Sequence, residues 1–205
     1  MTYELILGSS SPRRADLLQQ IGVDFTVVQP NIDESVMTGE LAKSYVQRMA
    51  KNKYLSIQEG LLKGKPIADQ NDIVLCADTI IVFETEIMGK PRDREESLSM
   101  LERLSGCDHK VITSVTVGQN NHFVSFLVET IVTFRILEKE ECLAYWYTGE
   151  PQDKAGGYGI QGIGSVFIQS ISGSYSNVVG LPLMETTQAL EKLGISVLGV
   201  SNQRF

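Results

Sequence analysis

The amino-acid sequence predicts an α/β fold built on a mixed β-sheet. Strand-like apolar runs and helix-like amphipathic runs are interspersed along the chain, which is typical of a sheet with crossover helices. Two of the longest strand-like runs are separated only by the turn-rich segment 118–121, so we expect part of the sheet to be antiparallel. Hydrophobic residues make up 42% of the 205 positions, enough to bury a sizeable core.

The first strand–helix unit has the clearest end signals. A strand is expected over 3–8, followed by a serine-rich turn and a helix over 12–21. Ser11 suits the N-cap, the proline after it suits the first helical position, and Gly22 suits the C-terminal stop. A short strand is expected next, over 25–28.

The remaining elements follow from the helical and strand periodicities of the apolar residues. Apolar residues at helical spacing predict helices over 41–57, 97–104, 138–148 and 183–193. Strand patterns cover 72–83, 111–117, 123–136 and 165–171, and the first of these is broken at Ala77-Asp78-Thr79. The polar, turn-rich segment 64–71 indicates a loop rather than a linker, so we expect a single domain over 1–205.

Composition argues against several classes of protein. The formal net charge is −7, whereas a general nucleic-acid binder needs a basic excess to neutralise phosphates. No apolar stretch approaches the ~20 residues of a membrane span, and the N-terminus lacks the pattern of a secretory signal. The three cysteines match neither a disulfide framework nor a zinc site. We therefore expect a cytoplasmic protein with no nucleic-acid or membrane partner.

The Ser-Ser-Ser-Pro-Arg-Arg segment at 9–14 is a candidate anion site. It joins the first strand to the first helix, whose N-terminus presents free N–H groups and the positive end of the helix dipole. Serine hydroxyls and the guanidinium groups of Arg13 and Arg14 add donors that suit phosphate. Judged by residue type and spacing alone, an ordinary capped helix with a solvated arginine pair explains the segment equally well.

Acidic residues give a second candidate. Asp78 interrupts an otherwise apolar strand, where an unpaired charge is costly to bury. Asp33 and Glu34 form another acidic pair, and carboxylates brought together could bind Mg²⁺ or Mn²⁺ and orient an attacking water. The structural alternatives are an edge-strand aspartate and a turn. The burial argument favours a functional Asp78 and leaves Glu34 undecided.

Lysines and glycines complete the candidates. Lys53 and Lys90 suit phosphates as point charges, although an isolated lysine is usually an ordinary surface residue. Residues 157–162 form a G-x-G-x-x-G, but a dinucleotide site needs this motif between a strand and a helix, whereas here it precedes the strand pattern at 165–171. We expect these glycines to allow close backbone approach to a ligand or a strand. The chain has no P-loop motif, and its two histidines exclude a histidine-rich metal site.

Short motifs follow one another in a specific order along nearly the whole chain. They are Leu7-Gly8-Ser9-Ser10-Ser11-Pro12-Arg13-Arg14, Asp33-Glu34, Ala77-Asp78-Thr79, Gly89-Lys90-Pro91, Leu104-Ser105-Gly106 with His109, Glu150-Pro151 with Asp153-Lys154-Ala155-Gly156, Tyr158-Gly159-Ile160-Gln161-Gly162 and Val179-Gly180-Leu181-Pro182. In this order and spacing the chain resembles the Maf (septum formation inhibitor-like) nucleotide pyrophosphatases. Each motif alone would be weak.

The resemblance implies a fold similar to that of the inosine triphosphate pyrophosphatases, with an elongated mixed sheet flanked by helices and two lobes around a cleft. It implies hydrolysis of nucleoside triphosphates between the α and β phosphates with a divalent cation (Mg²⁺, Mn²⁺ or Co²⁺). The family's proton acceptor falls on Asp78, which would hold the metal ion together with Glu34. The positions that match phosphate-binding residues are Ser9, Arg14, Lys53, Lys90 and Lys154. A homodimer is compatible with the resemblance and rests on nothing else.

Three positions imply the preferred base. Arg13, Thr79 and Gln161 match the dTTP/UTP branch of the family, whereas the 7-methyl-GTP branch carries Trp, Gln and Glu there. The Gln161 amide can pair with the O4/N3–H edge of uracil or thymine. The alternatives are a nucleotide-binding regulator of cell division that does not hydrolyse, and a pyrophosphatase for modified or other bases such as 7-methyl-GTP.

Two segments depart from the family pattern. Gly8 stands where the family usually has alanine, and we expect it to loosen the loop slightly without removing the site. The tail at 195–205 carries no family motif, so the sequence assigns it no role.

Overall fold

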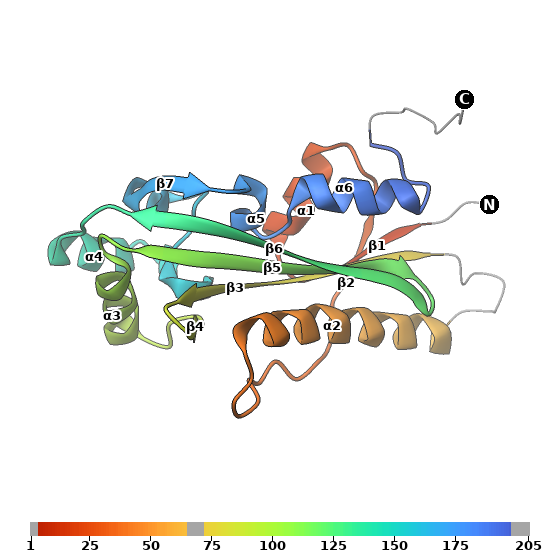
Figure 1. Ribbon diagram of the computed structural model, residues 1–205, viewed down its shortest axis with the longest axis horizontal. Coiled ribbons are helices and arrows are strands. Elements are labelled where there is room, and N and C mark those ends of the chain that lie inside the picture. Colours follow the sequence, from red (N-terminus) through yellow and green to blue (C-terminus); the bar gives the residue numbers. More distant parts are fainter. Residues whose placement is uncertain (1–3, 65–71, 198–205) are drawn as a thin grey trace.

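The computed structural model describes residues 4–64 and 72–197 and has an elongated shape (Figure 1). Residues 65–71 of the expected loop and residues 198–205 of the tail lie outside the described residues. The strands are β1 (Leu5–Gly8), β2 (Thr26–Val28), β3 (Ile73–Phe83), β4 (Glu86–Met88), β5 (Asp108–Gln119), β6 (His122–Phe134) and β7 (Ile168–Ser172). They form one seven-stranded sheet in the order β2-β1-β3-β5-β6-β7, with β4 paired to β3. β1 pairs in parallel with β2 and β3, whereas the remaining pairs are antiparallel, so the predicted mixed α/β sheet is confirmed.

Helices cover both faces of this sheet. They are α1 (Pro12–Gln20), α2 (Ala42–Gly64), α3 (Arg94–Leu104), α4 (Lys139–Trp146), α5 (Tyr175–Val179) and α6 (Leu183–Lys192), with 3₁₀ turns η2 (Glu150–Asp153), η3 (Ala155–Gly157) and η4 (Ile163–Phe167). Figure 1 shows α1, α5 and α6 on one face, α2 on the other, and α3 and α4 at one end. Among the described residues, none of the helices is long and apolar enough to cross a membrane.

Strand β3 is buried on both faces, which explains its nearly continuous apolar sequence. Leu75 and Ala77 belong to a core that includes residues of α1 and α6, whereas Val74 and Cys76 pack with α2. The strand continues without interruption, so this two-residue alternation places the consecutive side chains at 78 and 79 on opposite faces of the sheet.

One edge of β3 has a gap that positions the site. β1 pairs with β3 only as far as Gly8 opposite Cys76, and β4 pairs with β3 only from Ile81, opposite Met88 at the end of β4. Between these two neighbours, no described strand pairs with residues 77–80 along this edge, whereas β5 pairs with residues 74–82 along the other edge. The gap therefore exposes the middle of a buried strand between the ends of two short ones.

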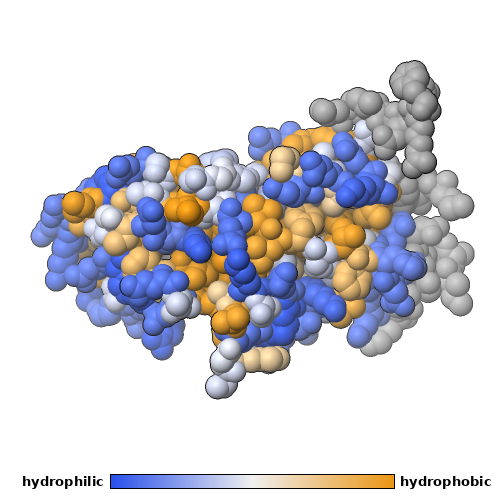
Figure 2. All heavy atoms as spheres, viewed as in Figure 1, coloured by the Kyte–Doolittle hydropathy of each residue, from blue (hydrophilic) through white to orange (hydrophobic). Residues whose placement is uncertain are grey.

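Two large hydrophobic cores lie along the sheet. The first joins β1, the first half of β3 and part of β5 to α1, α5 and α6. The second joins Ile81, Val111 and Phe134 of the other end to α3, α4 and the aromatic rings of Tyr145 and Tyr158. Figure 2 shows apolar side chains along the middle of one face, over β5 and β6, with hydrophilic surfaces around the helices.

Several predicted elements need correction. The strand over 72–83 is not broken at Ala77-Asp78-Thr79, because β5 pairs continuously with it. The strand expected over 165–171 begins only at Ile168, since a 3₁₀ turn occupies the residues before it. Helix α3 begins at Arg94 rather than at 97, and α2 extends to Gly64 rather than ending at 57.

The expectation that Gly8 loosens a loop is wrong. Gly8 is the last residue of β1, and a Cβ at this position would lie 2.3 Å from Cys76 Sγ and 3.1 Å from Ile57 Cγ1. The Cys76 side chain, which is fully buried, therefore fills the space that an alanine methyl would need. An alanine at position 8 would therefore require the Cys76 side chain to shift.

Candidate active site

A cavity of about 550 Å³ opens at the gap in the edge of β3. Every residue predicted for the site lines it, namely Ser9, Arg13, Arg14, Glu34, Lys53, Asp78, Thr79, Lys90, Lys154 and Gln161. These residues come from the β1–α1 turn, the start of α1, the segment before α2, α2 itself, β3, the segment after β4 and the loops around η2 and η3. Ligand sites are commonly found beyond the carboxyl ends of parallel strands, and this cavity lies beyond the carboxyl end of β1.

The cavity is locally positive although the chain is acidic. Its wall carries five cationic side chains, Arg13, Arg14, Lys53, Lys90 and Lys154, and three carboxylates, Glu34, Asp78 and Asp153. The whole chain has a formal net charge of −7. A positive pocket on a negative protein favours a small anionic ligand over an extended polyanion.

The turn after β1 is arranged as a set of donors. Ser9 Oγ accepts hydrogen bonds from the Ser11 backbone N–H at 3.1 Å and from Arg14 Nη1 at 3.1 Å, so its hydroxyl hydrogen is left to donate. Ser11 occupies the predicted N-cap position, but its side chain makes no capping bond. The N–H groups of the first turn of α1 therefore keep their capacity to bind an anion.

Arg14 is a buried cation held by neutral oxygens. Its Nε donates to the Gly180 carbonyl at 2.8 Å and its Nη2 donates to Thr79 Oγ1 at 3.0 Å. Only 8% of Arg14 is exposed, and it forms no ion pair within residues 4–64 and 72–197. Burial lowers the pKa of Arg14, partly offset by the nearby charge of Asp78. Because three of its five N–H groups are used, two remain for an anionic ligand that would compensate the charge.

The Thr79 hydroxyl belongs to a directed chain of hydrogen bonds. Thr113 Oγ1 donates to the Asn177 carbonyl at 3.1 Å, so it accepts from Thr79 Oγ1, which lies 2.9 Å away. Thr79 in turn accepts from Arg14. The chain fixes Thr79 and Arg14 against β5 and α5, and it shows that the Thr79 hydroxyl anchors Arg14 in this structure.

Asp78 lies on the opposite face of β3, beside α2. Lys53 Nζ is 2.7 Å from Asp78 Oδ1 and also 2.7 Å from Glu34 Oε1, so one ammonium bridges the two carboxylates. The Asp78 side chain is 13% exposed. Burial raises the pKa of Asp78, although the charges of Lys53 and Arg14 oppose this shift. A raised pKa suits a carboxylate that accepts a proton near neutral pH.

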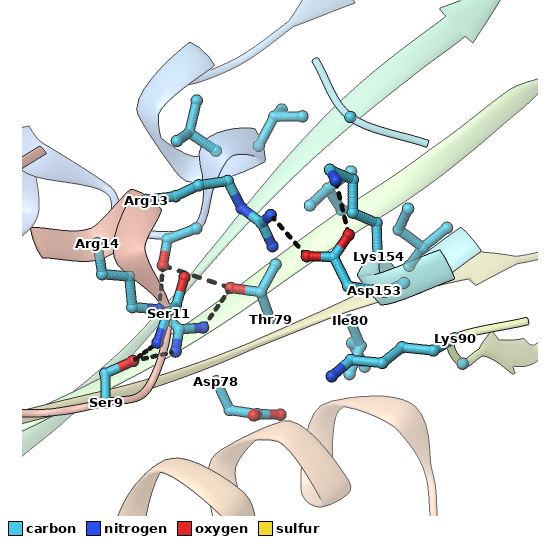
Figure 3. Close-up of a pocket in the computed structure, with 18 of the residues that line it drawn as sticks. Ser9, Ser11, Arg13, Arg14, Asp78, Thr79, Ile80, Lys90, Asp153 and Lys154 are labelled. Atoms are coloured by element: carbon cyan, nitrogen blue, oxygen red, sulfur yellow. Dashed lines mark hydrogen bonds and ion pairs between the residues drawn. The ribbon is translucent and has the colours of Figure 1, made fainter. Parts of the chain in front are cut away.

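Asp153 lies between two of the predicted substrate-binding cations (Figure 3). Its Oδ2 is 3.8 Å from Arg13 Nη1, and its Oδ1 accepts from Lys154 Nζ at 2.7 Å. Lys90 lies on the same side of the cavity as Lys154, across from Ser9 and Arg14, and has no ionic partner in the part of the chain that the structure describes. Asp153 thus occupies, in the free protein, the kind of position that an anionic group of a ligand would take.

The donor set fits the divalent cation that the family resemblance implies. Asp78 and Glu34 each place a carboxylate oxygen 2.7 Å from the same Lys53 ammonium, so two hard oxygen donors flank one cationic position. Mg²⁺ in phosphate-processing sites is commonly held by one or two carboxylates, with phosphate oxygens and waters completing its shell. No cluster of three or more metal-ligating side chains is found among the described residues.

Sequence reasoning missed several residues that shape the site. Thr113, Tyr45 and the carbonyl of Gly180 position predicted site residues, and Tyr45 does so by donating its hydroxyl to the Glu34 carbonyl at 2.9 Å. Only Gly180 carried a signal, because it belongs to one of the family motifs. His109 is buried and bonds to Tyr158 Oη at 2.7 Å, which agrees with a structural role.

Comparison with known proteins extends over nearly the whole chain. The family described as "Maf-like protein" matches residues 4–193. A protein of Pseudoalteromonas atlantica named "dTTP/UTP pyrophosphatase" is 48% identical over 192 residues, which cover 94% of this chain and 98% of the relative. Proteins with the same name from Shewanella oneidensis and Vibrio cholerae are 48% and 43% identical, covering 93% and 92% of this chain and 98% and 97% of their own. The chain belongs to the Maf-like protein family.

Proposed function

We propose that the chain is a nucleoside triphosphate pyrophosphatase that converts dTTP and UTP to the monophosphate and pyrophosphate. The observation that carries the proposal is one cavity in which a buried carboxylate, Asp78, faces an excess of cationic side chains at the end of β1. The relatives named dTTP/UTP pyrophosphatase support the substrate class. Arg13, Thr79 and Gln161, the positions that match the dTTP/UTP branch, all line this cavity.

The cationic wall accounts for binding of the triphosphate. The first turn of α1, the Ser9 hydroxyl and the two unused N–H groups of Arg14 form one donor surface. Lys90 and Lys154 contribute point charges from the other side of the cavity. When a triphosphate enters, we expect it to replace the carboxylate of Asp153 as the partner of Lys154, because a triphosphate carries more negative charge than one carboxylate.

Asp78 supplies the proton acceptor. Its carboxylate takes a proton from a water molecule as the water oxygen bonds to the α phosphorus, and the bond from that phosphorus to the bridging oxygen breaks. The electron pair of this bond leaves with pyrophosphate, whose charge the nearby cations stabilise. The products are the nucleoside monophosphate, pyrophosphate and a proton. The charge of the Lys53 ammonium favours the ionised form of Asp78 and so opposes the rise in its pKa that burial causes.

We propose Asp78 and Glu34 as the residues that would hold a divalent cation, which supplies neutralisation of phosphate charge when bound. Both carboxylates pair with Lys53 in the free protein, so Lys53 offsets their mutual repulsion there. With the Glu34 side chain 58% exposed, this carboxylate can turn without disrupting the core.

The proposal is tested by product identity. Purified protein is incubated with Mg²⁺, Mn²⁺ or Co²⁺ and with dTTP, UTP, CTP, GTP or 7-methyl-GTP, and pyrophosphate and orthophosphate are measured separately. Pyrophosphate is expected from dTTP and UTP above the other substrates. Asp78→Asn should lower turnover by at least about 10²-fold, as loss of a catalytic base does, whereas Asp33→Asn is the matched control because Asp33 does not line the cavity.

The other outcomes select the alternatives. Pyrophosphate released mainly from another base would keep the reaction and overturn the role of Arg13, Thr79 and Gln161. Tight binding of nucleotide without pyrophosphate release would favour the non-hydrolytic regulator.

We also propose a cytoplasmic location, supported by the three cysteines, which are all free.

A further inference from the structure

The loop that carries Gln161 is tied to two side chains outside the cavity, Glu150 and Tyr145. Glu150 Oε1 accepts from the Tyr145 hydroxyl at 2.8 Å and from the Gly164 backbone N–H at 3.1 Å. Glu150 Oε2 accepts from the Ile163 backbone N–H at 2.7 Å. The Tyr145 hydroxyl also accepts from the Gly159 backbone N–H at 3.1 Å. The two side chains thus bind the loop on both sides of Gln161.

The side chains of Glu150 and Tyr145 explain why this loop contains several glycines, a question that the sequence left open. A Cβ on Gly162 would lie 2.3 Å from Glu150 Oε2, and a Cβ on Gly164 would lie 2.6 Å from Tyr145 Oη. A Cβ on Gly159 would lie 3.0 Å from Glu150 Oε1 and 2.7 Å from the Lys154 side chain. The glycines therefore let the loop backbone close on a carboxylate and a phenol of the protein itself.

The other restraints on the loop are local, namely backbone hydrogen bonds from Gly162 to Gly159 at 3.4 Å and from Ser165 to Gly162 at 3.1 Å. Gln161 and Gly162 are exposed and Ile163 is 52% exposed, so burial of these side chains does not fix their position. Ile160 is the partly buried apolar contact of this segment with the core. The position of Gln161 therefore depends largely on the hydrogen bonds to the pair.

Glu150 is ionised at neutral pH and serves a second element of the site. Burial alone would raise its pKa, but hydrogen bonds from Gly164, Tyr145 and Ile163 outweigh burial and lower it. Charge-assisted bonds of this kind are stronger than bonds between neutral groups. The Glu150 carbonyl also accepts from Lys154 Nζ at 2.9 Å, so the same residue holds a predicted phosphate-binding lysine.

We propose that Glu150 and Tyr145 are positioning residues for recognition of the pyrimidine base, because they hold the 159–164 loop so that Gln161 faces the cavity. Neither side chain lines the cavity, so both act through the loop. The inference rests on the proposed function, in which Gln161 recognises the base.

The test separates binding of the base from binding of phosphate. Calorimetric affinities for UMP and for inorganic tripolyphosphate, which has no base, are measured for the wild-type protein and for Tyr145→Phe. The substitution removes one donor to Glu150 and the acceptor of the Gly159 N–H, so UMP should bind about tenfold more weakly while tripolyphosphate changes by less than about twofold. Tyr147→Phe, which alters an exposed tyrosine two residues away, should leave both affinities unchanged.

A Tyr145→Phe protein that binds UMP like the wild type, or that loses affinity equally for both ligands, would overturn the inference. Should that variant fail to fold, amide exchange of the wild-type protein gives the answer. The N–H groups of Gly159, Ile163 and Gly164 should be protected, and UMP should slow their exchange further while tripolyphosphate does not. Equal effects of the two ligands would overturn the inference. Wild-type protein that binds UMP no better than GMP would instead overturn the proposed function, and this inference with it.

Discussion

Substitution of Gly8 by alanine tests the packing that sets the end of β1, beside the cavity. The added Cβ would meet Cys76 Sγ at 2.3 Å and Ile57 Cγ1 at 3.1 Å, and both neighbours are buried. Overfilling a packed core costs about 1–3 kcal/mol. For a chain of this size each kcal/mol lowers Tm by about 2–4 °C, so Gly8→Ala should lower Tm by roughly 2–12 °C.

A second substitution isolates the cause. Cys76→Ala removes the sulfur and by itself should cost about 1 kcal/mol for the small void that it leaves. In the double variant the alanine methyl at position 8 occupies the space of the sulfur, so the two effects should offset each other by about 1–3 kcal/mol. Urea unfolding of the four proteins gives this coupling energy, with UTP hydrolysis measured in parallel. A stable Gly8→Ala protein, or two strictly additive effects, would refute the packing argument.

Three further predictions concern buried polar groups. Because burial raises the pKa of Asp78 above 3.8, the wild-type protein should lose stability as pH rises through the folded-state pKa. Denaturation curves should therefore show that Asp78→Asn is more stable than the wild type at pH 8, and that this difference shrinks as pH falls toward 3.8. Burial lowers the pKa of His109 from 6.5 to about 4, so folding should lose stability as pH falls through that window, and an NMR titration near 6.5 would contradict this. Thr113→Val should cost about 1–3 kcal/mol in urea unfolding, because the Asn177 carbonyl loses its Thr113 donor and Thr79 loses its Thr113 acceptor, while Thr113→Ser should be nearly neutral.

The elements with local end signals could be predicted from the sequence. Pro12 and Gly22 bracket α1 closely, because a proline and a left-handed glycine act on the backbone next to them. The short elements β4 and α5 were missed, since three or five residues carry too little periodicity and are held by their neighbours. The 3₁₀ turn before β7 has the same apolar composition as a strand.

The candidate site was predictable to a similar extent. Asp78 is identified by its charge inside an apolar strand, and the cluster of serines and arginines by its place between a strand and a helix. No local pattern shows that Lys53 bridges Asp78 to Glu34, because the three residues meet only in the folded protein. Nor could the sequence show that Glu150 lies against the glycines of its loop, since this contact is purely tertiary.

The position of water attack tests the central claim most directly. UTP is hydrolysed in water enriched in ¹⁸O, and the products are separated and examined by mass spectrometry for the label. Attack at the α phosphorus predicts ¹⁸O in UMP and none in pyrophosphate. The role of Asp78 predicts that Asp78→Asn forms little labelled product, while Asp33→Asn forms as much as the wild type. Label in pyrophosphate, or undiminished labelling of UMP by Asp78→Asn, would contradict the account.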